Sequence, residues 1–129
     1  MSFSDYLENK ILAHTFSGTT FTPASTLYLA LYTVAPNDDG TGGTEVSTSG
    51  TGYARQTVTF TTTASQSSNT SAVEFATATA SYGTVVAVGV LDASTSGNLY
   101  AVGTLSVSKA ISTGDVFRVP AGDLDIDLT

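Results

Sequence analysis

The length, composition and charge of the chain exclude several classes of protein. Its 129 residues are enough for one domain with its own core, and the absence of cysteine excludes disulfides and thiolate metal sites. Eleven carboxylates stand against four Lys and Arg residues, which gives a net charge of −7. Because nucleic acids and anionic membranes are bound through clustered cations, we expect neither as a partner.

The composition predicts an all-β protein. The sequence contains 23 threonines and 16 serines but only two lysines and three glutamates. Threonine favours strands, serine and glycine favour turns, and the strong helix formers among the charged residues are scarce. Nothing approaches the roughly 18 consecutive apolar residues of a membrane span, and the opening MSFSDYLENK lacks the basic and apolar regions of a secretory signal.

Residues 2–16 are the exception and are predicted to form a short amphipathic helix. Ser2 or Ser4 can cap it, and Gly18 can end it. A helix of this length is too short to be stable alone, so it must pack on its own sheet or on a neighbouring subunit. The apolar face that would make this contact consists of Phe3, Leu7 and Ile11.

The clearest strand covers Thr26–Thr33. Three leucines alternate with tyrosine and alanine, and we expect the leucines to face the core. Tyr28 and Tyr32 then mark a second, amphipathic face, which the helix or another chain could cover.

The rest of the chain alternates between predicted strands and polar segments. Asn37–Gly52 and Thr63–Ser71 are predicted to be loops, and Asp92–Asn98 to be a hairpin turn. We expect a small antiparallel β-sandwich, jelly-roll-like, of seven or eight strands over residues 26–129, in a single domain with the helix. Its other predicted strands are Tyr53–Thr62, Val73–Ala78, Tyr82–Leu91, Leu99–Val107, Asp115–Val119 and Asp123–Leu128.

Catalytic and cofactor chemistry is not expected. His14 is the only histidine and lies near the predicted helix end, where the helix dipole favours it. A glycosidase needs two facing carboxylates, and the sequence pairs neither Glu45 nor Glu74 with a partner. No nucleophile elbow, phosphate-binding loop or zinc-protease motif is present, so we predict no enzyme and no cofactor.

One row of carboxylates deserves consideration as a metal site. Asp123, Asp125 and Asp127 alternate with Leu124, Ile126 and Leu128, so the three carboxylates share one face of a predicted strand. Oxygen ligands of this kind suit Ca²⁺, although they project side by side and the ion needs six or more ligands. A solvated edge strand that is protected by charge explains the same pattern.

Three blocks of the sequence resemble a family of small tailed-phage proteins, usually called phage tail fibre proteins. The first block, SFSDYLENKILAHTFSGTTFTPASTLYLALYT, covers residues 2–33, and the others cover residues 76–105 and 109–128. The sequence departs from the family within Asn37–Gly52 and Thr61–Ser71, and it has Tyr82 where many relatives would have tryptophan.

The resemblance implies a structural protein of the virion. A compact domain without a shaft favours a capsid-decorating (cement) protein on the outer head surface, which would stabilise the shell. It would be made in the host cytoplasm and would bind the major capsid protein or tail proteins as a homo-oligomer, with a trimer favoured. Two alternatives are a tail fibre or tail-associated module, and a host-surface glycan-binding module in which Tyr28 and Tyr32 stack on a sugar.

Overall fold

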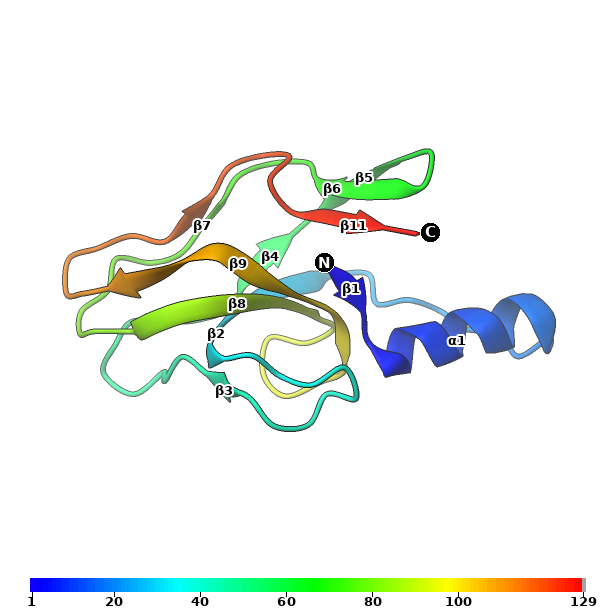
Figure 1. The fold of residues 1–129 in the computed structure, drawn as a ribbon, viewed down its shortest axis with the longest axis horizontal. Helices are drawn as coiled ribbons and strands as arrows, with labels where there is room; N and C mark the ends of the chain where they lie inside the picture. Colours follow the sequence, from blue (N-terminus) through cyan, green and yellow to red (C-terminus); the bar gives the residue numbers. More distant parts are fainter. Residues whose placement is uncertain (129) are drawn as a thin grey trace.

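The computed structural model describes residues 1–128, which form eleven strands and one helix (Figure 1). Within these residues no helix is long and apolar enough to cross a membrane. The elements are β1 (Ser2–Phe3), α1 (Asp5–Phe16), β2 (Leu27–Val34), β3 (Thr44–Glu45), β4 (Gln56–Val58), β5 (Phe60–Thr63), β6 (Gln66–Asn69), β7 (Val73–Glu74), β8 (Gly83–Leu91), β9 (Leu99–Ile111), β10 (Arg118–Val119) and β11 (Asp125–Asp127).

The strands pair in three antiparallel sheets. The largest has the order β1-β9-β8-β2-β3, and β4 pairs with β2 as well. The second sheet has the order β11-β6-β5, and the third is the pair β10-β7. The prediction of an all-β, antiparallel fold with one short helix is therefore confirmed, while the jelly-roll connectivity stays a prediction.

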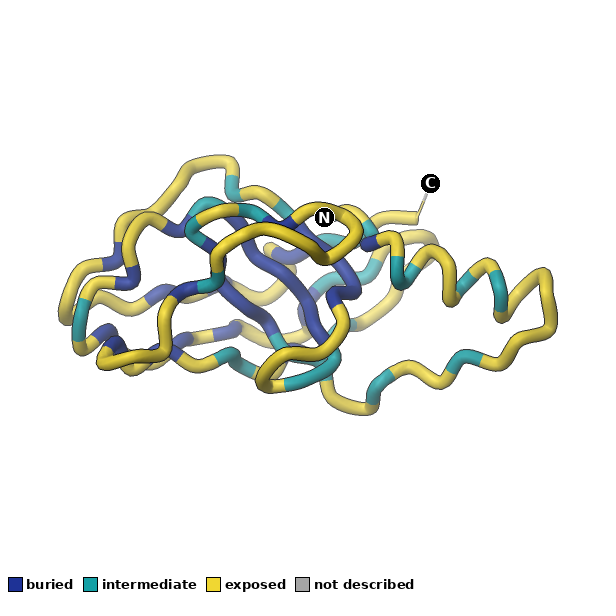
Figure 2. The backbone as a smooth tube through the Cα atoms, turned by 90° about the horizontal axis from the view of Figure 1, so that it is seen from below, coloured by how far each residue is buried: buried dark blue, intermediate teal, exposed yellow. Residues whose placement is uncertain are grey.

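The main core lies between the largest sheet and the two smaller ones. Leu29 and Leu31 of β2 are fully buried in it, as their alternation with tyrosine and alanine predicted. Phe75 stacks on Tyr53, with ring centroids 6.0 Å apart, and meets Phe117 edge to face at 5.9 Å. In Figure 2 the buried residues run through the centre of this body, whereas the helix is mostly exposed.

The opposite face of β2 is covered by the chain itself. Tyr32 is buried there beside Leu99, and its ring lies so close to Gly89 that a Cβ on this glycine would be 2.9 Å from Tyr32 Cε2. The half-buried residues packed against this second cluster are Ala35, which follows β2, and Val86. The expectation that the helix or another chain covers this face is therefore wrong for Tyr32, because side chains of β8 and β9 in the same chain pack against it.

Several predicted boundaries are also wrong. The helix begins at Asp5, because Ser2 and Phe3 pair with Val102 and Ala101 of β9 instead of joining the helical turn. The predicted strand Tyr53–Thr62 is divided into β4, which pairs with β2, and β5, which pairs with β6.

Both predicted polar loops contain strands, which raises the number of strands above eight. β3 lies within Asn37–Gly52, and β6 lies within Thr63–Ser71. Neither segment has an apolar alternation, so partners that are distant in sequence supply the hydrogen bonds that make them strands.

A wide bulge interrupts the long strand β9. The pair Ala87–Thr104 is followed by the pair Val85–Lys109, so that Val86 of β8 faces residues 105–108 of β9. Bulges of this kind protect a sheet edge against pairing with another chain. Val107 in the bulge is 70% exposed.

Candidate interaction surfaces

The helix α1 is fastened to the body only at its first turn. Ser4 caps the helix, because its Oγ accepts a hydrogen bond from the Leu7 N–H at 3.2 Å and donates one to the Leu99 carbonyl. The Ser4 N–H donates to the Tyr100 carbonyl at 2.8 Å. Through these hydrogen bonds the buried residue Ser4 joins the start of the helix to strand β9.

The segment 17–26 returns alongside the helix, and the two together are called the arm here. The Phe21 N–H donates to His14 Nδ1 at 3.1 Å, and the Ala24 N–H donates to the Tyr100 hydroxyl at 3.2 Å. The Phe21 ring packs edge to face against Tyr6 and Tyr100, with centroids 6.5 and 6.2 Å away. The side chain of His14 therefore holds the backbone of the segment 17–26 in place.

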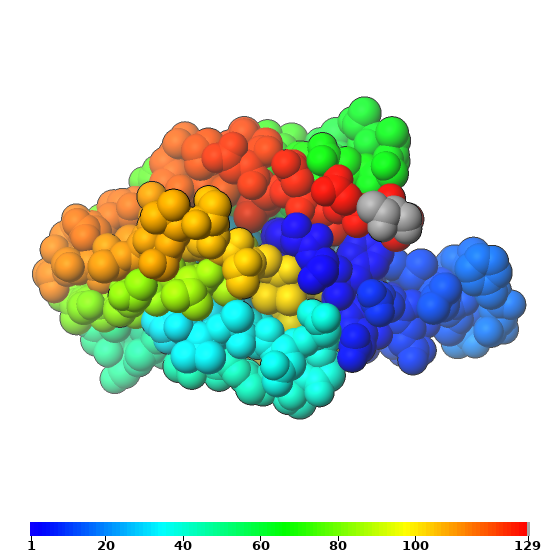
Figure 3. Space-filling view, in the orientation of Figure 1, coloured from blue at the N-terminus to red at the C-terminus, as the bar shows by residue number. Residues whose placement is uncertain are grey.

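Beyond this anchor the arm projects into solvent, as Figures 2 and 3 show. Across Asp5–Phe16, all of which the structure describes, no residue is buried. Leu12 and Phe16 are one helical turn apart, so they share a face, and Phe16 is 80% exposed. The two side chains therefore form an apolar pair on a projecting element, which is a candidate contact site.

A hollow of about 300 Å³ opens at the base of the arm. It lies between β1 and the first turn of α1 on one side and the β5–β6 hairpin and β11 on the other, and its lining is largely apolar. Thr62, Ala64, Ser65, Gln66 and Ser67 of the hairpin region also line it. The apolar side chains of this hollow include Phe3, Leu7, Leu27, Phe60, Ile126 and Leu128.

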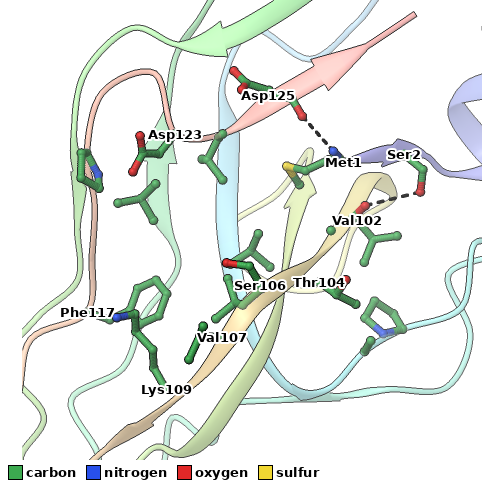
Figure 4. A pocket seen from close by; sticks show the side chains of 18 of the residues that line it. Met1, Ser2, Val102, Thr104, Ser106, Val107, Lys109, Phe117, Asp123 and Asp125 are labelled. Atoms are coloured by element: carbon green, nitrogen blue, oxygen red, sulfur yellow. Dashed lines mark hydrogen bonds between the residues drawn. The ribbon is translucent and has the colours of Figure 1, made fainter. Parts of the chain in front are cut away.

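A second, wider groove of about 1090 Å³ follows the bulged part of β9 (Figure 4). Lys109 and Arg118 line it, and so do the carboxylates of Asp123 and Asp125. The Met1 amino group borders it and donates to the Asp125 carbonyl at 2.8 Å. The bulge makes the adjacent sheet edge a poor template for an added strand.

The predicted row of aspartates does not converge on one point. Asp125 accepts a hydrogen bond from the Ser68 hydroxyl, and Asp127 accepts one from Gln66 Nε2 at 2.8 Å. Within residues 1–128 no group of three His, Cys, Asp or Glu side chains is placed to hold a metal ion. The carboxylates of Asp125 and Asp127 instead bind polar side chains of β6, the neighbouring strand.

The most strongly coupled polar cluster joins Glu45, Tyr53 and Arg55. Arg55 binds both carboxylate oxygens of Glu45, with Nε–Oε2 at 2.9 Å and Nη2–Oε1 at 2.8 Å. The Tyr53 hydroxyl donates to the same carboxylate at 2.6 Å. Arg55 Nη1 donates to the carbonyls of Ala93 and Ser96, both at 2.8 Å, so the cluster holds the turn between β8 and β9.

The titration of these groups follows from their contacts. Burial disfavours the charged form of Glu45, but hydrogen bonds from Arg55 and Tyr53 and the charge of Arg55 outweigh it, so its pKa lies below the ordinary value. Hydrogen bonding to Glu45 raises the pKa of Arg55. Burial, and then the bond to Glu45, raise the pKa of Tyr53. The cluster is therefore an internal structural lock, because its side chains bond to one another and to the turn between β8 and β9.

We expect this lock to make folding stability depend on pH. Because the pKa of Glu45 is lowered on folding, its contribution is fully present above the ordinary glutamate pKa of about 4.3 and is lost as the pH falls through the lower pKa of the folded state. Urea unfolding of the native chain and of the Glu45→Gln variant from pH 7 to pH 3 measures the contribution of Glu45 to the free energy of unfolding. Their stability difference should shrink toward pH 3, and a difference that stays constant or grows would contradict the assignment.

The interface residues predicted from sequence lie in different places. Phe3 and Leu7 line the hollow, and Ile11 is half-buried on the arm. Tyr28 is half-buried, whereas Tyr32 is 7% exposed and therefore unavailable to a partner or a sugar. The roles of the others stay predictions.

Sequence reasoning missed Leu12 and Phe16. Their spacing of four residues was visible in the sequence, but the apolar residues on the other face hid its importance. The residues of the β5–β6 hairpin that line the hollow form no apolar pattern along the sequence that could have predicted this role.

Comparison with known protein families finds a match over almost the whole chain. The model of the family described as podophage GP4 fiber I protein gp80 matches residues 2–127. No curated protein matches the chain. The match covers the arm and every lining residue of the hollow and the groove except Leu128 and Met1.

Proposed function

The chain belongs to the family of podophage GP4 fiber I protein gp80, and from this membership we propose that it is a structural subunit of a phage tail fibre. The family match over residues 2–127 is the observation that carries the proposal. In this role the chain binds other virion proteins and is located on the virion. The fibre description of the family supports this role, so we propose it in preference to the capsid-decorating role that the sequence favoured.

The shape of the chain supports a structural role. A fibre subunit needs a rigid body and a surface that joins it to its neighbours, and the arm displays apolar residues well outside the body. The polar cluster around Arg55 has its hydrogen bonds within the chain. We therefore propose a role in assembly rather than catalysis.

Imaging of particles tests the location. Purified protein is added to heads and, separately, to tails from phage that lack it, and cryo-EM locates the added density. We expect density on the tail at the fibre positions. Regular density on the head lattice, with none on the tail, would overturn the fibre proposal and restore the decoration role.

A further inference from the structure

The tip of the arm and the hollow lie too far apart to meet in one chain. Leu7 lines the hollow, and Phe16 follows it by nine residues, or roughly 14 Å along the helix axis. Nine residues are also two and a half turns, so the two side chains point to opposite sides of the helix. The exposed pair Leu12 and Phe16 therefore cannot fill the hollow of its own chain.

The two surfaces nevertheless match in chemistry. The arm tip offers a leucine and a phenylalanine, and the hollow of about 300 Å³ is lined mainly by aliphatic and aromatic side chains. Removing apolar surface from water contributes about 25 cal/mol per Å². Docking of the Leu12 and Phe16 side chains in the hollow would bury two apolar surfaces that a single chain leaves exposed to water.

The distribution of charge favours the same pairing. Residues 9–26 contain Lys10 and no carboxylate, so they carry +1, whereas the rest of the chain, with three cations and eleven carboxylates, carries −8. A carboxylate stands beside the hollow, because Asp127 binds its lining residue Gln66. Two bodies repel each other, while the outer part of the arm, residues 9–26, beyond Asp5 and Glu8 of the first helical turn, is attracted to the body of another copy.

From these observations we propose that Leu12 and Phe16 of one copy dock in the hollow of a second copy, so that copies associate head to tail. The proposal deepens the fibre function by naming the first partner of the subunit, and it rests on that function. Because the arm tip and the hollow are different surfaces, the contact is heterologous, and repeating it gives a closed ring where the rotation closes and an open filament where it does not. We expect a closed ring, with a trimer favoured.

The association state of the purified chain tests the contact. Sedimentation velocity over a range of concentrations should show reversible association of the native chain. Phe16→Asp should raise the dissociation constant by at least about tenfold, because the charge would enter an apolar hollow. Val107→Asp is the matched control, since Val107 is also an exposed apolar residue but lies on the bulge of β9. A monomeric native chain, or equal effects of the two variants, would overturn the proposal.

Cross-linking tests the geometry, and the cysteine-free chain makes it specific. Phe16→Cys and Ser65→Cys chains are mixed under mild oxidation and should form a mixed disulfide dimer. Phe16→Cys mixed with Ser106→Cys, on the bulge, should not. A Phe16→Cys chain that cross-links efficiently to itself would indicate an arm-to-arm contact and would overturn the head-to-tail assignment.

The charge contribution has its own matched pair. Lys10→Glu and Lys109→Glu change the net charge equally, but only the first lies on the arm. We expect Lys10→Glu to weaken association several-fold more than Lys109→Glu, and the difference to shrink at high salt. A chain that joins the tail in the imaging experiment yet stays monomeric here would refute the docking and leave the fibre proposal standing.

Discussion

Replacing Phe75 by alanine is expected to lower the free energy of unfolding by about 3–5 kcal/mol, the range for truncating a fully buried phenylalanine. Phe75 is only 2% exposed and packs on the rings of Tyr53 and Phe117, so its removal leaves a cavity between the largest sheet and the β10–β7 pair. Refilling such a cavity would require both aromatic neighbours to move.

Urea unfolding measures this loss, with Phe16→Ala as the control. The same substitution at Phe16, 80% exposed on the arm, should change the free energy of unfolding by no more than about 0.5 kcal/mol in the monomer. Equal losses at the two positions would mean that the core is not where the packing of Phe75 places it.

Replacing Glu45 by alanine is expected to cost about 3 kcal/mol of unfolding free energy, because breaking a buried ion pair leaves its partner's charge uncompensated. The side chain of Arg55 is 7% exposed and that of Glu45 is 27% exposed, which places the loss at the lower end of the range for buried pairs. Tyr53 would lose its acceptor in the same variant.

The control for this prediction is Glu74→Ala. Glu74 meets Arg118 at 3.8 Å with 64% of its side chain exposed, so its removal should cost at most about 1 kcal/mol. A double-mutant cycle isolates the pair itself. Arg55→Met should cost at least about 1 kcal/mol less in the Glu45→Ala chain than in the native chain. Additive losses would show that the two residues stabilise the fold independently.

The Arg55 lock also has a local consequence. Since Arg55 holds the carbonyls of Ala93 and Ser96, its loss should loosen the turn between β8 and β9 more than the rest of the body. Hydrogen exchange of the amides in residues 92–98, compared with those of β2, would reveal this difference. The turn is thus ordered by a side chain distant in sequence rather than by its own residues alone.

The sequence by itself determined the parts of the fold that depend on neighbours along the chain. The scarcity of helix formers predicted an all-β protein, and alternation placed Leu29 and Leu31 in the core. Tyr82–Leu91 was predicted to be a strand, and β8 lies within this segment, between β9 and β2. These signals are local, since side chains two residues apart in a strand must share one environment.

Only the tertiary structure decided the rest. β6, with the sequence QSSN, is a strand because β5 and β11 lie on either side of it and satisfy its backbone, not because of its own propensity. The partnership of Glu45 with Arg55 and the assembly of the hollow from Leu7, Phe60 and Ile126 likewise join residues far apart in the chain. Hydrogen bonds and burial are made between such residues only when the sheets pack, so no periodicity along the sequence records them.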